Sequence, residues 1–266
     1  MAPGLDDDLA LAHRLADAAD AISLAGFTGA VVAHELKADG SPVSAVDRAV
    51  EGRIDEMLAA ERPADGMLGE EVGARGPAGR RWIVDGIDGT ILFVAGRTGW
   101  ATQIALEVDG EVVAGVTTVP AGGRRWWAAR GRGAWTRDRP SGEPTPVRVS
   151  GGGDLARARY SLIPPREAIT TDAGADLVAR LAAATGAGGD YVPPHEHGAL
   201  FVADGRAEAC LQVGGGPWDF AALSVLVAGA GGRWSDLAGR PDIYGGGPLL
   251  FSNGGVHEAA LGALAA

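Results

Sequence analysis

The fold is decided by the stretch Arg81-Trp82-Ile83-Val84-Asp85-Gly86-Ile87-Asp88-Gly89-Thr90. Its apolar run leads Asp85 into a glycine-rich turn, and Asp88 follows three residues later, so both carboxylates can point into one small volume. A second acidic segment, Gly216-Pro217-Trp218-Asp219-Phe220-Ala221-Ala222, lies far along the chain. Together the two segments predict a site that holds a divalent metal ion against a phosphate group.

Acidic side chains that converge in a pocket repel each other unless a cation neutralises them. A hard ion with a preference for oxygen ligands, such as Mg²⁺, is the natural occupant. The segment Gly69-Glu70-Glu71, with Glu70 fifteen residues before Asp85, and Asp219 are the candidates for further ligands. Two structural alternatives stay open at this point: Glu70 and Glu71 can form a solvated charged turn, and Asp219 can be a helix N-cap.

The composition favours a soluble cytoplasmic protein. The chain has 266 residues, 46% of them hydrophobic, which permits a substantial core. Its single cysteine, Cys210, excludes an intramolecular disulfide and suggests a reducing compartment. The start is acidic rather than signal-like, and no apolar run is long enough to cross a membrane. A net charge of −11 argues against nucleic acid as a partner, so an anionic substrate must be attracted locally through metal.

Hydrophobic spacing predicts a first helix over residues 8–25 and a second one after Ser44. Asp47 completes a capping-box pattern with Ser44, and it can serve the helix terminus, the site or both. Residues 82–84, 102–108, 112–119 and 125–129 read as strands, with Asp109-Gly110 as a hairpin turn. Further helices are expected over about 174–184 and from Asp219 to the glycines at 231–232.

These motifs resemble those of the inositol monophosphatase superfamily, both in their order and in their separations. The resemblance rests on the Gly-Glu-Glu segment, on the stretch from Asp85 to Thr90 and on the Trp-Asp-x-Ala-Ala pattern at 218–222. The segment from Lys37 to Asp47 is similar to an upstream motif of the same family. The stretch from Trp100 to Arg130 is most similar to bacterial members of the histidinol-phosphate phosphatase branch. The resemblance runs from about residue 9 to residue 261.

The resemblance implies a layered α/β fold, an α-β-α-β-α sandwich of the inositol monophosphatase and fructose-1,6-bisphosphatase type. An N-terminal half, residues 1–150, would carry the Glu-Glu and Asp-x-Ile-Asp-Gly-Thr motifs. A C-terminal half, residues 151–266, would supply the Trp-Asp motif and the substrate pocket. The active site would lie between the halves, and a homodimer is expected from the same resemblance.

Residue by residue, the resemblance implies two Mg²⁺ sites that share Asp85. One would be formed by Glu70, Asp85 and the carbonyl of Ile87, and the other by Asp85, Asp88 and Asp219. Glu70, counted among the catalytic residues, would also reach a third, weaker ion.

The resemblance also assigns the catalytic and phosphate-binding groups. Thr90, supported by Asp47, would position the attacking water and help to deprotonate it. The backbone N–H groups of Gly89 and Thr90 would hold phosphate oxygens, and Gln212 and Asp219 would contact the substrate.

The predicted function is Mg²⁺-dependent hydrolysis of a small phosphate monoester. Histidinol phosphate, an inositol phosphate and a sugar or nucleoside phosphate, including one of specialised metabolism, all stay open as substrates. Gln212 stands where relatives often carry an acidic residue, so a substrate amine would lose its ionic partner.

The alternative function is a catalytically weak, phosphatase-like protein with a binding or regulatory role. It is motivated by Gly86, where the family commonly has proline, and by Ile91-Leu92, where it commonly has a polar pair. The flexible glycine is expected to loosen the turn unless packing fixes it.

One further constellation is the segment Pro193-Pro194-His195-Glu196-His197. It offers two imidazoles, but no cysteine or third histidine lies nearby in the sequence, so a loop that borders the substrate is favoured over a zinc site.

Overall fold

The computed structural model describes residues 4–38, 40–138, 142–186, 191 and 196–265. Its first layer consists of two packed helices, α1 (Leu5–Gly26) and α2 (Ala45–Glu61). Both match the predicted helices, and α2 begins with the expected capping box, in which the side chains of Ser44 and Asp47 each accept a backbone N–H. A short hairpin of β1 (His34–Leu36) and β2 (Pro42–Ser44) lies between the two helices in the sequence.

The second layer is an eight-stranded sheet, counted over the described residues, with the order β10-β9-β8-β7-β6-β5-β3-β4. All neighbours in it are antiparallel except β3 and β5, which are parallel. The turn between β6 and β7 contains Asp109 and Gly110, both with positive φ, as the hairpin prediction requires. The strands are β3 (Gly66–Gly69), β4 (Gly73–Arg75), β5 (Arg80–Asp88), β6 (Ala101–Val108), β7 (Glu111–Val119), β8 (Arg124–Ala129), β9 (Ala134–Asp138) and β10 (Thr145–Val147).

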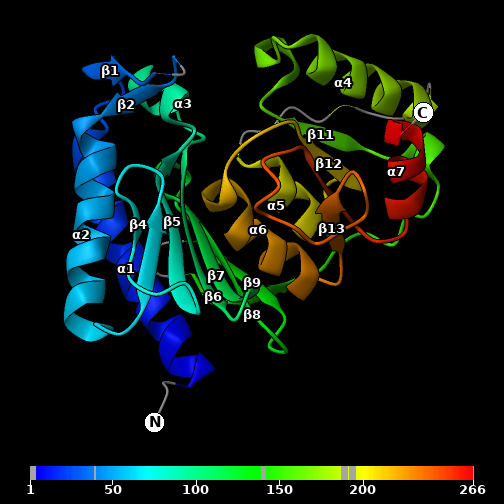
Figure 1. Cartoon of the computed structure of the whole chain (residues 1–266). Helices are drawn as coiled ribbons and strands as arrows, with labels where there is room; N and C mark the ends of the chain where they lie inside the picture. The colour runs from blue at the N-terminus through cyan, green and yellow to red at the C-terminus, as the bar shows by residue number, and fades with distance from the viewer. Residues whose placement is uncertain (1–3, 39, 139–141, 187–190, 192–195, 266) are drawn as a thin grey trace.

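The remaining layers come from the second part of the chain (Figure 1). Helices α5 (Gly198–Ala203) and α6 (Pro217–Gly229) lie between the large sheet and a sheet of order β11-β12-β14-β13, which has four strands within the described ranges. Helices α4 (Asp172–Thr185) and α7 (His257–Ala265) cover its outer face. The strands are β11 (Tyr160–Ile163), β12 (Ala209–Gln212), β13 (Arg233–Asp236) and β14 (Leu249–Ser252), and the short helices are α3 (Thr90–Val94), η1 (Pro120–Gly122), η2 (Leu155–Arg157) and η3 (Arg166–Ala168). The predicted α-β-α-β-α order of layers is confirmed.

The two faces of the large sheet pack against different helices. Large residues such as Trp82, Val84 and Leu106 pack in one buried cluster with α1 and α2. On the other face a row of small residues crosses neighbouring strands, because Ala105 pairs with Gly115, Gly115 with Ala128 and Ala128 with Ala134. This row lets the backbone of α6 approach the sheet closely.

Gly115 sets the closest approach. A Cβ atom on Gly115 would lie 2.8 Å from Val225 Cγ1 and 3.0 Å from the Ala222 backbone of α6. Gly115→Ala is therefore expected to lower the free energy of unfolding by about 1–3 kcal/mol, as overpacking typically does. Gly52→Ala in α2 is the matched control, because its Cβ would meet nothing within 4 Å, and it should stabilise by roughly 1 kcal/mol. Urea denaturation measures both, and equal effects of the two changes would contradict the packing argument.

The proposed boundary between two halves near residue 150 stays a prediction. One buried cluster contains both Ile83 and Ala105 of the large sheet and Leu226 and Phe251 of the second part, so the two parts share a core. The predicted homodimer also stays a prediction.

None of the described helices combines the length and the apolarity that a bilayer crossing requires.

Candidate active site

Two aspartates reach one side of the large sheet because β5 is irregular. Side chains alternate along a regular strand, so residues three apart point to opposite faces. The pairing of β5 with β6 shifts between Asp85 and Asp88, as in a β-bulge, and places both carboxylates on the side covered by α6. The Gly86 carbonyl accepts a hydrogen bond from Thr102 Oγ1 (2.8 Å), which holds the irregular segment against β6.

Asp219 comes from the first turn of α6. The helix begins with Pro217, and Gly216 is its N-cap, so the alternative that Asp219 is the N-cap is wrong. Asp219 stands three residues after the cap instead, and its Oδ2 accepts the Gly216 N–H at 2.6 Å. A Cβ atom on Gly215 would lie 2.8 Å from the same oxygen, so this glycine permits the chain to pass beside Asp219.

The three aspartates form a compact all-oxygen cluster. Within the described ranges, one carboxylate oxygen from each of Asp85, Asp88 and Asp219 lies within 4.8 Å of the others. Burial, followed by the charge of Glu70, raises the pKa of Asp85 well above its usual range. Burial also raises the pKa of Asp88 to about 7, and burial with the charge of Asp88 raises that of Asp219. Such a cluster is unfavourable by itself and fits a hard divalent cation.

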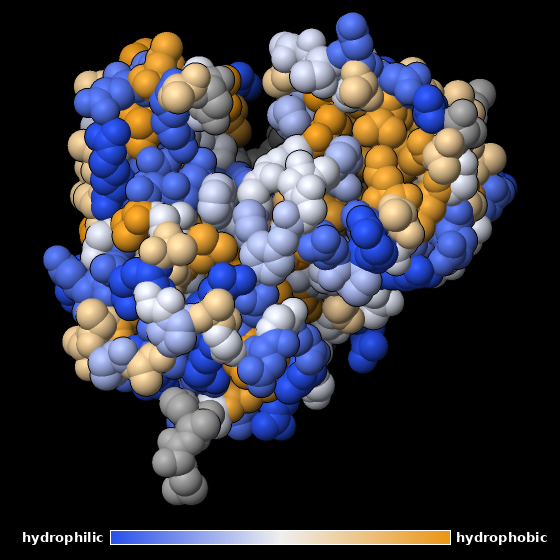
Figure 2. Space-filling model, in the orientation of Figure 1, coloured by the Kyte–Doolittle hydropathy of each residue, from blue (hydrophilic) through white to orange (hydrophobic). Residues whose placement is uncertain are grey.

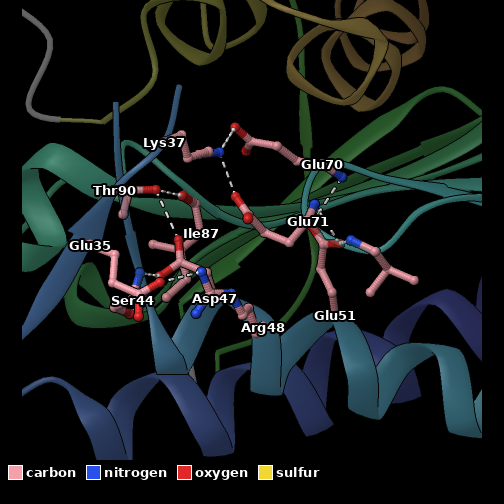
Figure 3. A network of polar contacts seen from close by, with 11 residues as sticks. Glu35, Lys37, Ser44, Asp47, Arg48, Glu51, Glu70, Glu71, Ile87 and Thr90 are labelled. Atoms are coloured by element: carbon pink, nitrogen blue, oxygen red, sulfur yellow. Dashed lines mark hydrogen bonds and ion pairs between the residues drawn. The ribbon is translucent and has the colours of Figure 1, made fainter. Parts of the chain in front are cut away.

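Thr90, two residues after Asp88, meets Asp47 (Figure 3). Thr90 Oγ1 lies 2.9 Å from Asp47 Oδ1 and 2.9 Å from the carbonyl oxygen of Ile87, so its single proton can go to either acceptor. Asp47 Oδ2 accepts hydrogen bonds from Ser44 N (3.0 Å) and Ser44 Oγ (2.6 Å). Asp47 therefore both caps α2 and contacts Thr90. Gly89, at φ 81°, turns the chain from β5 into α3.

Glu70 lies beside the three aspartates and faces a lysine. Lys37 Nζ donates to Glu70 Oε1 (2.7 Å) and to Glu71 Oε1 (2.5 Å), and both carboxylates are partly buried rather than solvated (Figure 3). Burial raises the pKa of Glu70, although Lys37 opposes the shift. Residues 70–72 do form a charged turn between β3 and β4, but it is partly buried, so the solvated alternative is wrong. One internal ammonium group is shared by the two glutamates.

The sequence analysis assigned no role to Gln103, which contacts the cluster directly. Gln103 Nε2 donates to Asp88 Oδ2 (2.6 Å) and approaches the Asp219 carbonyl oxygen (3.4 Å), so it joins β5 to α6. The sequence does contain one sign of this role, because Gln103 is a polar amide within the strand predicted over residues 102–108.

His197 also borders the cluster. Its Nδ1 accepts the Ala199 N–H (3.3 Å) as the N-cap of α5, which leaves the proton on Nε2, 3.6 Å from Asp88 Oδ2. Burial lowers the pKa of His197 to about 3, so the ring is neutral. His195 and the two prolines before Glu196 lie outside the described residues, so the zinc alternative is not addressed by the structure.

Gln212 ends β12 and is buried, with an exposed fraction of 1%. Side chains alternate along the strand, so Gln212 shares a face with Cys210, whose Sγ lies against Gly198 at the start of α5. Within the part of the chain that the structure describes, its Oε1 has no hydrogen-bond partner. The side chain thus offers a neutral, unpaired acceptor on the α5 side.

The site opens to solvent near the top of the molecule. Figure 2 shows a hollow in the surface between the part built from β1, β2 and α3 and the part that carries α4. The C-terminal end of β5 and the first turn of α6 lie at the inner end of this region in Figure 1. Ile91, next to Thr90, is 64% exposed.

The fold, the acidic cluster and the relatives together define the chain as a phosphoric monoester hydrolase. It belongs to the inositol monophosphatase family, whose sequence model matches residues 5–266.

Curated relatives support the branch expected from the sequence. A histidinol-phosphatase of Streptomyces coelicolor is 40% identical over 98% of both chains. A Streptomyces griseus protein named glucose-1-phosphate thymidylyltransferase is 41% identical over 97% of this chain and 96% of its own. An inositol monophosphatase from Zymomonas mobilis has a similar structure, with a TM-score of 0.82 and 30% identity, covering 99% of this chain and all of the other. The predicted resemblance is thereby confirmed.

Proposed function

We propose that this phosphatase hydrolyses the phosphate monoester of a small polyhydroxy alcohol that carries no charge besides its phosphate, with the help of Mg²⁺ at the aspartate cluster. The observation that carries the proposal is the convergence of Asp85, Asp88 and Asp219 within 4.8 Å in a buried place. When bound there, divalent cations neutralise phosphate charge, activate a water molecule and stabilise the leaving oxygen.

The chain's own residues divide the remaining work. Asp85, Asp88 and Asp219, with the Ile87 carbonyl and Glu70, are the proposed cation ligands, two or three ions being the expected number. Glu70 must exchange its contact with Lys37 for this role. Thr90 orients the attacking water and passes a proton to Asp47, whose Oδ1 already lies 2.9 Å from the hydroxyl. The N–H groups of Gly89 and Thr90, at the turn into α3, are the proposed phosphate donors.

The substrate preference follows from two neutral side chains, His197 beside the cluster and Gln212, which the resemblance places at the substrate. Gln212 supplies an amide oxygen where a carboxylate would attract an ammonium group, and His197 is uncharged. A hydroxyl group can both donate to the oxygen of Gln212 and accept the Nε2 proton of His197. An amine of an amino-alcohol phosphate gains no ionic partner from these two residues. A cyclitol or sugar phosphate therefore fits better than histidinol phosphate.

A substrate panel with phosphate detection tests the function. Mg²⁺-dependent phosphate release is expected from inositol and sugar phosphates, including glucose 1-phosphate, at higher kcat/KM than from histidinol phosphate. Gln212→Glu should raise the preference for histidinol phosphate by roughly tenfold or more, because a hydrogen bond to a charged group contributes about 1.5–3 kcal/mol. No phosphate release from any of these esters would reject the proposal and favour the binding or regulatory alternative. Glucose 1-phosphate with dTTP tests the thymidylyl transfer named for the Streptomyces griseus relative.

A further inference from the structure

The Glu51 carboxylate lies fully buried beneath the site, on α2. Its Oε1 accepts the backbone N–H of Glu70 (3.1 Å), and its Oε2 accepts those of Glu71 (3.0 Å) and Val72 (2.9 Å). Figure 3 shows this carboxylate below the segment from which Glu70 and Glu71 rise toward Lys37. One side chain therefore fixes the backbone of the glutamate segment, while the glutamate side chains point away from it.

The same carboxylate also reaches the aspartate segment. The backbone N–H of Gly86, between Asp85 and Ile87, is also directed at the Glu51 carboxylate and favours its charged form. A Cβ atom on Gly86 would lie 3.1 Å from Glu51 Cγ, 3.1 Å from the Asp47 carbonyl oxygen and 3.2 Å from Val50 Cγ1. Helix α2 thus packs directly on this glycine, so the condition under which the turn was expected not to loosen, fixation by packing, is met.

Residue 86 matters chemically because a proline there would have no N–H group. The family pattern Asp-Pro-Ile-Asp-Gly-Thr therefore cannot make the contact between residue 86 and Glu51. In this chain the replacement of proline by glycine removes a rigid ring but adds a hydrogen-bond donor, which is aimed at a buried carboxylate.

We infer that Glu51 is a positioning residue, and that it clamps the Glu70 segment and the Asp85–Asp88 segment to one helix through backbone N–H groups, with Gly86 as the donor on the aspartate side. The clamp sets the distance between the carboxylates of the two segments before a cation binds. Its effect on cation affinity rests on the proposed function, whereas the clamp itself does not.

Glu51→Gln tests the clamp because it keeps the side-chain shape but turns one acceptor into an NH₂ group that faces N–H donors. In metal-free protein, hydrogen exchange should accelerate at the amides of residues 70–72 and 86, with little change in α4 and α7. In Mg²⁺ titration calorimetry, affinity should fall about tenfold or more, as for other groups that orient metal ligands. Unchanged exchange at these amides would overturn the inference. If exchange accelerates in Glu51→Gln but the parent protein binds no Mg²⁺, the clamp stands and the proposed function is rejected.

Gly86→Pro and Gly86→Ala test the aspartate side with Glu51 intact. Both add a Cβ atom, but only proline removes the N–H group. Gly86→Pro is expected to weaken Mg²⁺ binding and accelerate exchange at residues 70–72 more than Gly86→Ala does. In the Glu51→Gln background this difference between the two variants should shrink. Equal effects of proline and alanine in the parent protein would show that Gly86 is not a donor to the clamp.

Discussion

Asp85→Asn should lower the rate of phosphate release by roughly a thousandfold, equivalent to about 4 kcal/mol of lost transition-state stabilisation. Asp85 lies at the centre of the acidic residues, because burial and the charges of Glu70, Asp88 and Asp219 all raise its pKa. An amide there keeps the shape of the side chain and removes the charge that attracts the cation. Steady-state kinetics with an inositol or sugar phosphate measures the rate, and calorimetry measures the weaker binding of Mg²⁺.

The same change should not unfold the metal-free protein. Asparagine removes one of several mutually repelling buried carboxylates, so the variant is expected to be at least as stable as the parent in the presence of chelator. Asp176→Asn in α4, an exposed aspartate paired with Arg180, is the matched control and should leave activity unchanged. Near-normal hydrolysis by Asp85→Asn would refute the assignment of the cation site.

Removal of divalent cations should abolish activity and make the stability of the protein depend on pH in an unusual direction. The pKa of Asp88 is raised to about 7, and the pKa values of Asp85 and Asp219 are also raised by burial. In the unfolded chain these groups have pKa values near 4. At a pH between the unfolded and the folded pKa values of these groups, the folded state binds more protons than the unfolded state. The free energy of unfolding therefore falls as the pH rises. Metal-free protein should therefore be less stable at pH 8 than at pH 6.5.

The window above pH 6.5 separates this effect from that of the buried histidines. Burial lowers the pKa of His197 to about 3 and that of His257 to about 4, so they destabilise the fold as the pH falls through about 6.5, which is the opposite direction, and most of their effect lies below that pH. Mg²⁺ at a hundred times its dissociation constant should restore about 2.7 kcal/mol, and it should restore less at lower pH because protons compete for the carboxylates. Denaturant titrations at pH 6.5–8, with chelator or with Mg²⁺, measure the free energy of unfolding in both states. A metal-free stability that rises over this range would contradict the burial of the charged cluster.

Much of the site was predictable from short stretches of sequence. The apolar run before Asp85, the capping box at Ser44 and the Asp109-Gly110 turn each depend on residues that are near neighbours, and each is found in the structure. The approach of Asp219 to Asp85 and Asp88 was expected from the acidic motifs and from the resemblance, but neither explains how the segments come together. It depends on the small residues Ala105, Gly115 and Ala128, which become one row only when the strands pair in this register.

The partners of the acidic residues could not be predicted in the same way. Lys37, Glu51 and Gln103 come from a loop, a helix and a strand, and their distances from the carboxylates follow from packing. At Gly86 the sequence leaves open whether packing fixes the flexible turn, because its neighbours give no sign of the helix that packs on it. The structure shows it against Asp47, Val50 and Glu51 instead.

The sequence alone determined the family, the helices and strands near the motifs, and the identity of the acidic residues, because turn chemistry and hydrophobic periodicity act over a few neighbouring residues. The tertiary structure alone decided which oxygens meet. A bulge in β5 turns Asp88 to the side of Asp85, and a row of small side chains admits α6 with Asp219. Both depend on strand register and close packing between distant segments, which local preferences do not encode.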